Sequence, residues 1–317
     1  MKTHKEIGGY FQLELQKGEH LHSDALRLNS CRNALQLLMR ALAPKRVLLP
    51  AFSCSAVFEA IQREGVLYET YKTNEQFELQ LPPDLSKTDY VVINNYFGLC
   101  DDIIARYTSE SNIIVDNAQS FFSDPLEVVG TIYSPRKFVG VADGGMLMTN
   151  EAIDLPLEFE SSTAYSEQLF TRIEEGANAG YKQYLRTEEW ISKQSPLKMS
   201  HLTDRILTSI DYGNIKKRRI ENYRFLQEEL GGVNEFNKSW DGIQVPLCYP
   251  FIHRGKTQEL REKLLKAKVF CPLYWPNVFA DVADAGAFEF EKNIIPLPID
   301  QRYGREEMEV MIKIVKS

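Results

Sequence analysis

Asn112-Ile113-Ile114-Val115-Asp116-Asn117-Ala118-Gln119 is the stretch of this sequence that decides the fold. Its apolar half shows no alternation with polar residues, which is typical of a strand buried on both faces of a parallel sheet. Further strands are expected at the apolar runs 46–50, 66–71, 89–94 and 144–149, and helices at 30–42 and 55–62. Because helices and strands alternate, we predict an α/β fold with a mostly parallel central sheet and helices on both faces.

The pattern changes after residue 150. Residues 151–198 are polar and expected to be irregular, and residues 202–230 have helical spacing that ends at Gly231-Gly232, a helix-stop signal. The remainder predicts a strand, a helix, a strand and a closing helix, at 243–249, 256–268, 294–297 and from Arg305 onwards. We therefore predict a large α/β domain at 1–210, followed over 211–317 by an interdomain helix and a small α+β domain.

Asp116 at the end of its strand and Lys137 in a predicted loop form the most informative pair. A lysine that can form a Schiff base and a buried aspartate that can keep a pyridine nitrogen protonated are the minimum set for holding pyridoxal phosphate (PLP). Gly144-Gly145 follows the lysine and permits positive φ and close backbone approach. Taken alone, such an aspartate is more often a helix cap and such a lysine is simply solvated.

Neighbouring segments supply further parts of such a site. Residues 29–35 open a helix whose free N–H groups could hold a phosphate, although a plain N-cap at Asn29 or Ser30 is the alternative. Cys54 follows a strand and could lie against a flat ring, as could Phe52, for which core packing is the alternative. Ala118 is small enough to lie under the ring, and Gln119 can donate a hydrogen bond to a ring hydroxyl.

Composition excludes several classes of function. The net charge of −7 gives no electrostatic case for binding nucleic acid or an anionic membrane. No apolar run approaches the ~20 residues of a membrane-spanning helix, and no apolar signal segment follows the N-terminus. Five cysteines without CxxC spacing favour a reduced, cytoplasmic protein. The five histidines lack the spacing of a metal site, so no metal is expected.

Six segments, taken in their order along the chain, resemble the DegT/DnrJ/StrS family of PLP-dependent sugar aminotransferases. They are SCRNAL (30–35), LPAFSC (49–54), NYFG (95–98), DNAQ (116–119), SPRK (134–137) and ADGG (142–145). Later segments at 200–204, 219–223, 274–276 and 297–299 are similar as well, so that the resemblance covers nearly the whole chain. It implies a fold type I PLP-dependent enzyme.

The resemblance also implies residue roles. Lys137 would be the Schiff-base lysine, Asp116 the partner of the pyridine nitrogen, and Gln119 the contact of the ring hydroxyl. Arg32 and Asn33 would lie at the phosphate, and Cys54 would take the place of the aromatic side chain that stacks on the ring. His201 would reach across a homodimer to the phosphate of the partner subunit. The substrates implied are an amino-acid donor, glutamate, and a nucleotide-linked keto-sugar.

Four positions depart from the family pattern. Cys31-Arg32 replaces the usual Gly-Thr at the helix start, Cys54 replaces the stacking aromatic residue, and Ile132 stands where a phosphate-binding serine is expected. Two other functions therefore stay open: a PLP-dependent lyase of the same fold, and a non-catalytic relative that uses the fold for binding. A yellow purified protein would argue against the second, and conversion of PLP to pyridoxamine phosphate by glutamate would argue against the first.

Overall fold

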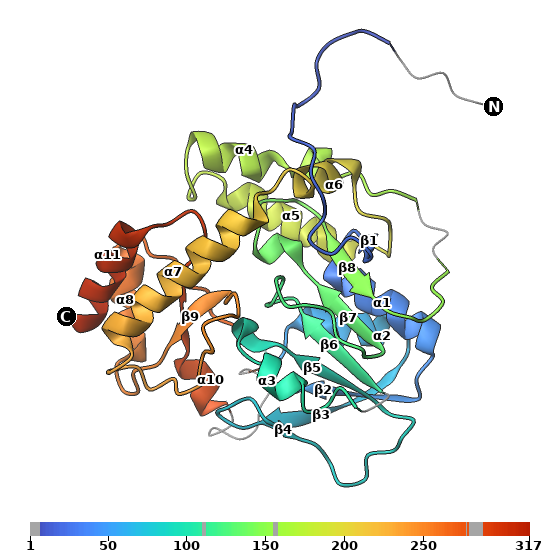
Figure 1. The fold of residues 1–317 in the computed structure, drawn as a ribbon, viewed down its shortest axis with the longest axis horizontal. Coiled ribbons are helices and arrows are strands. Elements are labelled where there is room, and N and C mark those ends of the chain that lie inside the picture. Colours follow the sequence, from blue (N-terminus) through green and yellow to red (C-terminus); the bar gives the residue numbers. More distant parts are fainter. Residues whose placement is uncertain (1–6, 110–111, 155–157, 277, 279–287) are drawn as a thin grey trace.

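A central sheet of eight strands organises the molecule (Figure 1). The computed structural model describes residues 7–109, 112–154, 158–276, 278 and 288–317. The strands lie in the order β1-β8-β7-β6-β5-β2-β3-β4. Their bounds are Leu26–Leu28 (β1), Arg46–Pro50 (β2), Leu67–Thr73 (β3), Leu79–Gln80 (β4), Tyr90–Asn94 (β5), Ile113–Asn117 (β6), Gly130–Tyr133 (β7) and Gly145–Met148 (β8). Neighbours from β7 through β6, β5 and β2 to β3 pair in parallel, and the other pairings are antiparallel.

The sheet is buried on both faces, as its apolar strands predicted. The helices α1 (Cys31–Leu42) and α2 (Ser55–Arg63) cover one face, where Val92 and Ile114 belong to the same apolar cluster as Leu35. Val91 and Val115 point to the other face and pack with Ile104 of the short helix α3 (Asp101–Ile104). Since successive residues of a strand point to opposite faces, continuous apolar runs are what this architecture requires.

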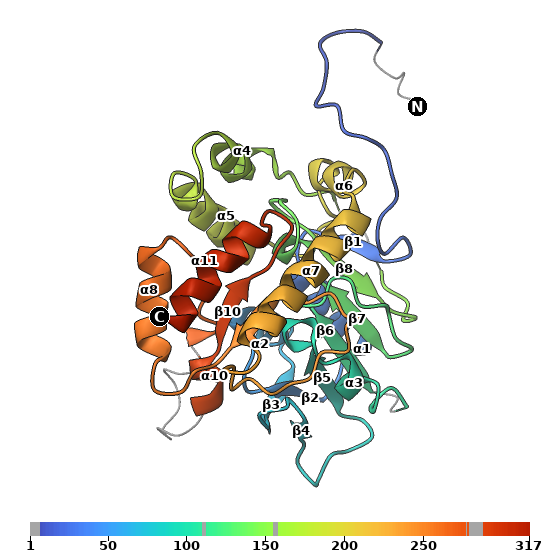
Figure 2. The ribbon, with the colours of Figure 1, turned by 60° about the vertical axis from the view of Figure 1, so that its left-hand side comes forward.

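The C-terminal part begins with the long helix α7 (Tyr212–Leu230), which lies beside α11 (Arg305–Lys316) (Figure 2). It also contains a two-stranded antiparallel sheet of β9 (Cys248–Phe251) and β10 (Ile295–Pro298), with helices α8 (Thr257–Lys266) and α10 (Glu289–Asn293). One hydrophobic cluster joins this part to the large sheet, because Phe97 packs in the same cluster as Phe251. We propose the domain boundary at residue 210, in the turn before α7.

Two expectations about helices were wrong. Residues 151–198 are not irregular throughout: they contain α4 (Glu167–Glu174) and α5 (Tyr181–Lys193). Contacts distant in sequence hold α5, such as the stack of Trp190 on Tyr165 at 4.0 Å between ring centroids, and a local pattern does not display them. Residues 202–230 form two helices, α6 (His201–Leu207) and α7, since Asp211 caps α7 by accepting a hydrogen bond from the backbone N of Asn214 (2.9 Å).

The predicted strand at 243–249 begins later than expected. Only Cys248 and Tyr249 of that run are in β9, which continues to Phe251. Ahead of it, the side chain of Asp241 accepts hydrogen bonds from the backbone N of Ile243 and Gln244, which makes a turn instead of a strand. The 79% exposure of Ile243 agrees with that turn.

Candidate active site

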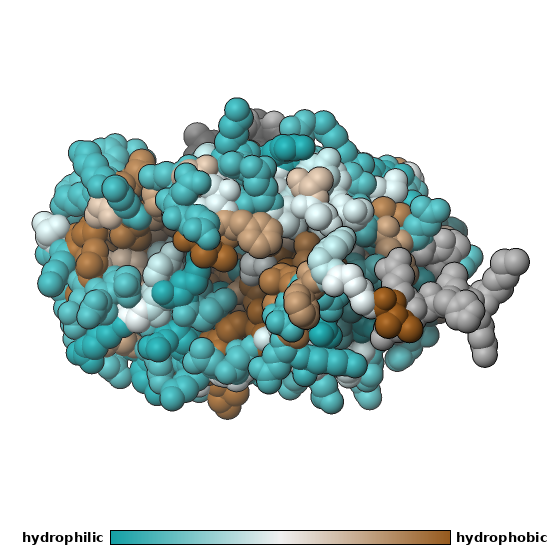
Figure 3. All heavy atoms as spheres, turned by 90° about the horizontal axis from the view of Figure 1, so that it is seen from above, coloured by the Kyte–Doolittle hydropathy of each residue, from teal (hydrophilic) through white to brown (hydrophobic). Residues whose placement is uncertain are grey.

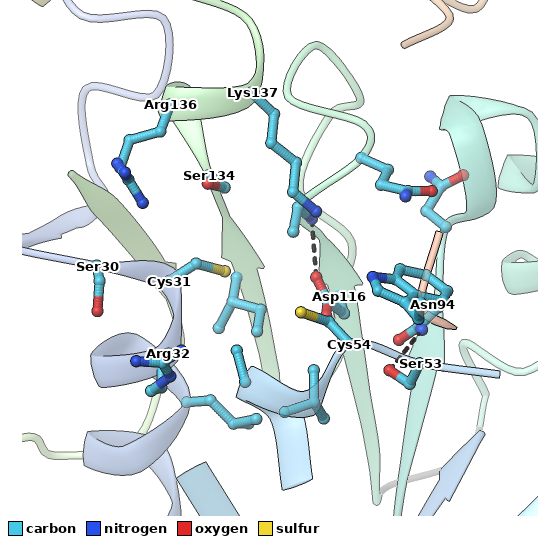
Figure 4. Close-up of a pocket in the computed structure, with 18 of the residues that line it drawn as sticks. Ser30, Cys31, Arg32, Ser53, Cys54, Asn94, Asp116, Ser134, Arg136 and Lys137 are labelled. Atoms are coloured by element: carbon cyan, nitrogen blue, oxygen red, sulfur yellow. Dashed lines mark hydrogen bonds between the residues drawn. The ribbon is translucent and has the colours of Figure 1, made fainter. Parts of the chain in front are cut away.

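A cavity of about 190 Å³ lies at the carboxyl ends of four neighbouring parallel strands (Figure 4). The residues that follow β2, β5, β6 and β7 line it together with the first turn of α1, the end of α5 and Trp275. The carboxyl edge of a parallel sheet is where ligands bind in open α/β folds. The residues that line the cavity include Ser30, Cys31, Arg32, Ser53, Cys54, Asn94, Asp116, Ala118, Gln119, Ser134, Arg136, Lys137, Glu188, Ile191 and Trp275.

Lys137 and Asp116 meet in this cavity. Asp116 is a buried residue of β6, and its Oδ1 accepts a hydrogen bond from the backbone N of Ala118 (2.8 Å). Lys137 ends a short 3₁₀ turn (Pro135–Lys137) after β7, and its chain extends toward Asp116 (Figure 4). Burial raises the pKa of Asp116, and the positive charge of Lys137 opposes that rise. The pocket therefore presents a carboxylate that a cationic ring nitrogen would stabilise, next to a primary amine.

Gln119 has one half of its amide fixed and the other half open. Its Oε1 accepts a hydrogen bond from the backbone N of Phe97 (2.8 Å), whereas its buried Nε2 has no partner among the described residues. The turn that presents Phe97 requires Gly98, whose φ is +71° and whose added Cβ would lie 3.2 Å from the carbonyl oxygen of Gln119. A buried donor without an acceptor is costly, so this nitrogen is suited to a ligand hydroxyl or phenolate.

The start of α1 forms a tight cradle on another side of the cavity. Ser30 is its N-cap, one of the two residues expected to take that place, and accepts a hydrogen bond from the backbone N of Asn33 (3.1 Å). Gly144 has a φ of +126°, and a Cβ on Gly145 would lie 2.1 Å from the carbonyl carbon of Ser30. The glycine pair thus lets β8 pass directly behind the helix start, where backbone N–H groups lack intrahelical partners.

The two residues expected at a phosphate have other partners here. Arg32 lines the cavity, but its Nη1 donates to the backbone O of Ser192 (2.8 Å) and its Nε lies 3.5 Å from Glu59. Asn33 does not line the cavity, because its side chain donates to Asn29 Oδ1 (2.8 Å) and to the backbone O of Ser195 (2.9 Å). In this structure Arg32 holds the last turn of α5 against α1, and Asn33 holds the segment that follows α5.

Cys54 lines the cavity beside Asp116 (Figure 4). Phe52 is 2% exposed and is not part of the cavity wall, so core packing, the alternative reading of this residue, is the one that the structure supports. Its ring packs against Trp275 at 4.6 Å between centroids, and Trp275 itself reaches the cavity. Trp275 holds a left-handed φ of +46°, a strained conformation for so large a residue.

His201 lies outside the cavity, at the first position of α6. Its exposed ring stacks on Phe159 at 4.1 Å between ring centroids. The preceding Ser200 is fixed by the buried Asp143, which accepts hydrogen bonds from the Ser200 backbone N (2.8 Å) and Oγ (2.7 Å). This network ties the ADGG segment to the start of α6. The role of His201 toward a partner subunit stays a prediction.

Sequence reasoning missed Arg136, Glu188 and Trp275. Arg136 directly precedes the lysine and forms a close ion pair with Glu188 of α5 in the cavity wall. Its position beside Lys137 was a usable signal, but Glu188 lies in a stretch that was expected to be irregular. Trp275 approaches from the C-terminal part of the chain, and nothing local marks it as a cavity residue.

Within residues 7–109, 112–154, 158–276, 278 and 288–317, no three His, Cys, Asp or Glu side chains gather in a way that could hold a metal ion. Over the same residues no helix combines the length and apolar character needed to cross a bilayer. All five cysteines are free thiols. Burial raises the pKa of the Cys31 thiol at the start of α1, so the reactive thiolate is disfavoured there.

Comparison with known proteins places the fold. No protein-family model matches the chain, and none of the curated proteins does. Solved structures do match. The sugar aminotransferase CalS13 from Micromonospora echinospora aligns with a TM-score of 0.63 at 14% identity, covering 92% of this chain and 86% of its own. A DegT DnrJ EryC1 StrS aminotransferase from Brucella abortus aligns with a TM-score of 0.63 at 14% identity, with coverages of 92% and 85%. NtdA from Bacillus subtilis with bound cofactor PMP gives a TM-score of 0.62 at 17% identity, with coverages of 92% and 73%.

The chain has the fold of these aminotransferases. The predicted α/β architecture, fold type I with a mostly parallel central sheet, is thereby confirmed. Because one fold can host several activities, the activity has to be argued from the residues of the cavity.

Proposed function

We propose that this protein is a PLP-dependent aminotransferase that moves an amino group from an amino-acid donor to a keto-sugar. The observation that carries the proposal is that Lys137, Asp116 and the open Nε2 of Gln119 belong to one cavity at the carboxyl edge of the sheet. Of the described residues that line this cavity, Lys137 alone carries a primary amine. The shared fold with CalS13 and NtdA supports the same function.

The cavity fits the cofactor at three points that the chain itself leaves open. The Asp116 carboxylate would hold the pyridine nitrogen, Gln119 Nε2 would donate to the ring hydroxyl, and Lys137 Nζ would bind the aldehyde carbon. Ala118 would lie against the ring, with Cys54 and Trp275 available on its other sides. When bound, PLP supplies a ring that accepts electrons from a substrate carbon. NtdA, whose structure holds cofactor PMP, shares this fold.

Lys137 is also placed to move a proton. Once an amino donor has taken its place at the aldehyde carbon, Lys137 Nζ would be the free base of the cavity, where it could take a proton from the donor's α-carbon. Asp116 would keep a positive charge on the ring nitrogen and so favour that proton transfer. The side chains of Ile191 and Trp275 border the same space and would help to exclude water.

We propose glutamate as the amino donor and a nucleotide-linked keto-sugar as the acceptor. The resemblance of the six ordered segments to the DegT/DnrJ/StrS family supports this choice, and so does the description of CalS13 as a sugar aminotransferase. A cytoplasmic location is part of the proposal, supported by the five free thiols.

We propose a homodimer as the functional unit. Six large apolar side chains are exposed on α4, on α5 and beside α6: Phe159, Phe170, Ile173, Tyr181, Tyr184 and Leu185. Brown patches on the face that carries α4 and α6 show apolar side chains gathered there (Figure 3). Such a surface is more apolar than a monomer needs, and His201 stacks on Phe159 within it. The same surface would let His201 approach the site of the partner subunit.

Borohydride reduction tests the proposal directly. The protein, incubated with PLP and reduced, should carry one pyridoxyl group, and peptide mapping should place it on Lys137. A label on another lysine, or none, would refute the assignment. In a separate, unreduced sample, glutamate should convert bound PLP to pyridoxamine phosphate, with loss of its absorbance near the visible range, whereas a lyase would leave the cofactor as PLP.

A further inference from the structure

The cavity wall contains an ion pair that its proposed chemistry does not use. Arg136, whose side chain is 18% exposed, pairs closely with Glu188, whose side chain is 40% exposed. The Nε of Arg136 is buried and has no hydrogen-bond partner among the described residues. Both residues line the cavity, so a guanidinium with unused donor capacity faces the ligand space.

Glu188 belongs to a helix that is fastened over this side of the cavity. Two arginines cap the C-terminal end of α5: Arg32 Nη1 donates to the backbone O of Ser192 (2.8 Å), and Arg63 Nη2 donates to the same oxygen (2.6 Å). Cations at a helix C-terminus are favourable, which explains why this end of α5 lies there. Together with the Arg136 pair, these contacts commit both cavity-lining arginines to α5.

The same side of the cavity is built for an anion. Figure 4 shows the guanidinium of Arg136 on the side that holds Ser134, Cys31 and Arg32, whereas Lys137 points away from it toward Asp116. The first turn of α1 contributes backbone N–H groups there, and the missing Cβ of Gly145 leaves β8 close behind it. The cavity of about 190 Å³ is smaller than the ~300–1,000 Å³ of typical small-molecule sites. Side chains of the cavity wall, among them the paired Arg136 and Glu188, occupy part of the space that a ligand would need.

We propose that Glu188 is a built-in competitor for the anion subsite and that a phosphate group binds by taking Arg136 from it. The inference rests on the proposed function, since the phosphate of the cofactor is the anion expected at this end. Arg136 would bind two phosphate oxygens in the planar geometry that guanidinium favours. A carboxylate held beside a phosphate dianion is repelled, so Glu188 would turn toward solvent, which its exposure permits.

This proposal gives a function to a departure from the family pattern. The chain lacks the usual Gly-Thr at the start of α1 and has Ile132 in place of a phosphate-binding serine. Arg136 would supply hydrogen-bond donors in place of the hydroxyl groups that this chain lacks at those positions. Affinity for phosphate would then depend on α5, because the pair with Glu188 must break before the subsite opens.

Calorimetric titration of the full chain with inorganic phosphate tests the competition without requiring any cofactor chemistry. Glu188→Gln should bind phosphate about fivefold more tightly than the wild type, a factor that corresponds to roughly 1 kcal/mol. Arg136→Met should weaken binding on the order of tenfold or more, and Arg136→Lys should recover part of the loss. Glu189→Gln is the matched control, because Glu189 lies on the same helix but pairs with Lys193 and does not line the cavity.

Several results would overturn the proposal. Equal phosphate affinity in Glu188→Gln and Glu189→Gln would remove Glu188 as a competitor, and unchanged affinity in Arg136→Met would remove Arg136 as the ligand. A gain in Glu188→Gln for glutarate but not for phosphate would assign Arg136 to a substrate carboxylate instead. Circular dichroism melting of each variant shows that it is folded, and Arg136→Lys keeps the arginine test decisive if Arg136→Met does not fold.

Comparison of PLP with pyridoxal separates this inference from the proposed function. In a Lys137→Ala background, where no Schiff base forms, Glu188→Gln should tighten binding of PLP but not of pyridoxal, which lacks the phosphate. If phosphate binding follows the pattern above while Lys137 is never labelled by borohydride, the anion subsite stands and the aminotransferase proposal fails. If Lys137 is labelled and phosphate binding ignores both variants, the reverse holds.

Discussion

Asp116 is a buried carboxyl group whose charged form is disfavoured by its surroundings. Burial raises its pKa above the ordinary value of about 3.9, with the charge of Lys137 opposing the rise. A carboxyl group whose pKa is higher in the folded chain binds its proton more tightly when folded. Its ionisation therefore lowers the free energy of unfolding as pH rises from the unfolded pKa, and the loss is complete above the folded pKa.

The ligand-free protein should show this cost in a comparison with Asp116→Asn. As pH rises from 3 to 7, the wild type should lose stability relative to the variant, so that Asp116→Asn has the higher melting temperature at neutral pH. Urea unfolding at several pH values measures the difference. Adding PLP should reverse the order, because the wild type alone then gains a cationic partner for the carboxylate. If Asp116→Asn were less stable than the wild type at every pH, ionisation of the buried Asp116 would not destabilise the ligand-free protein.

Turnover should respond to the same substitution in another way. Asp116→Asn should still bind PLP through Lys137 but lose transamination by about 100-fold or more, the scale of removing one electrostatic contributor to a transition state. Stopped-flow absorbance with glutamate follows the loss. Asp101→Asn is the control, since Asp101 is a partly buried carboxylate near the same sheet edge whose partners are Asn95 and Ser123. Near-normal turnover in Asp116→Asn would show that Asp116 has no role in catalysis and serves only to accept the hydrogen bond from the backbone N of Ala118.

Trp275 changes what is expected of Cys54. If Cys54 were the only side chain against the cofactor ring, Cys54→Tyr should tighten PLP binding. Trp275, however, lies in the cavity wall, and Phe52 packs behind it. We therefore predict that the added tyrosine ring overpacks the site and weakens PLP binding. Trp275→Ala should also weaken PLP by about 1 kcal/mol, the scale of an aromatic contact. Titration of the cofactor-free protein with PLP measures both. Tighter binding by Cys54→Tyr would show that Trp275 does not occupy the ring face.

The sequence was informative about this site where function depends on strand ends. Asp116 ends the apolar run of β6 and Gln119 follows that strand, so both could be expected at the sheet edge. Lys137 follows β7, which was not recognised, and was expected at the site from its spacing to Asp116 and from the glycine pair after it. Arg136 and Glu188 could not be paired in advance, because the contact joins a turn to a helix more than fifty residues away whose own formation depends on tertiary packing. Asn33 was expected at the phosphate because of the local motif around it, but its side chain instead donates hydrogen bonds to Asn29 and Ser195.

At the scale of elements, Gly145 decides how β8 and α1 fit together. A Cβ there would lie 2.1 Å from Ser30 C and 2.3 Å from Cys31 N, both backbone atoms that cannot turn aside. Gly145→Ala should therefore push the strand from the helix start, lower the free energy of unfolding by about 1–3 kcal/mol, and weaken phosphate and PLP binding together. Denaturant unfolding and titration measure the two effects.

Gly232→Ala is the control for that prediction. Gly232 follows α7, and nothing lies within 4 Å of the Cβ it would gain. Its substitution should change stability by less than about 0.5 kcal/mol, as surface substitutions usually do. If Gly145→Ala behaved like Gly232→Ala, the close approach of β8 to α1 would not be a requirement of the fold.

Helices and strands with a strong local sequence pattern were predicted well. The elements that were missed depend on contacts with residues distant in the sequence. The strand 46–50 and the helix near 31–42 have the expected bounds within a residue, since period and capping residues are local. The strand β7 carries few residues, and its burial comes from neighbours on both sides, so it was not recognised. Helix α5 depends on Arg32, Arg63 and Arg136, which reach it from α1, α2 and the lysine turn.

At the scale of the whole molecule, the C-terminal part closes the site as well as adding a small sheet. Trp275 comes from that part, and the hydrophobic cluster that includes Phe52, Phe97 and Phe251 is continuous across the join. A shared core makes large independent motion of the two parts costly, because separating them would expose apolar side chains at about 25 cal/mol per Å². We therefore expect ligands to enter through smaller movements, such as the proposed separation of Glu188 from Arg136.

Assembly is the last property to test. Figures 1 and 2 place α4, α5 and α6 at one end of the molecule, where exposed apolar side chains gather. If two copies pair through this end, Ile173→Asp, which puts a charge on a side chain that is 79% exposed in the single chain, should convert a dimer to a monomer in light scattering after size exclusion. Ile243→Asp is the matched control, because Ile243 is also 79% exposed but lies in the turn before β9. The monomeric variant should also bind PLP more weakly, since each site would lose His201 of the other subunit. A wild-type monomer that binds PLP tightly would contradict both the dimer and the role given to His201.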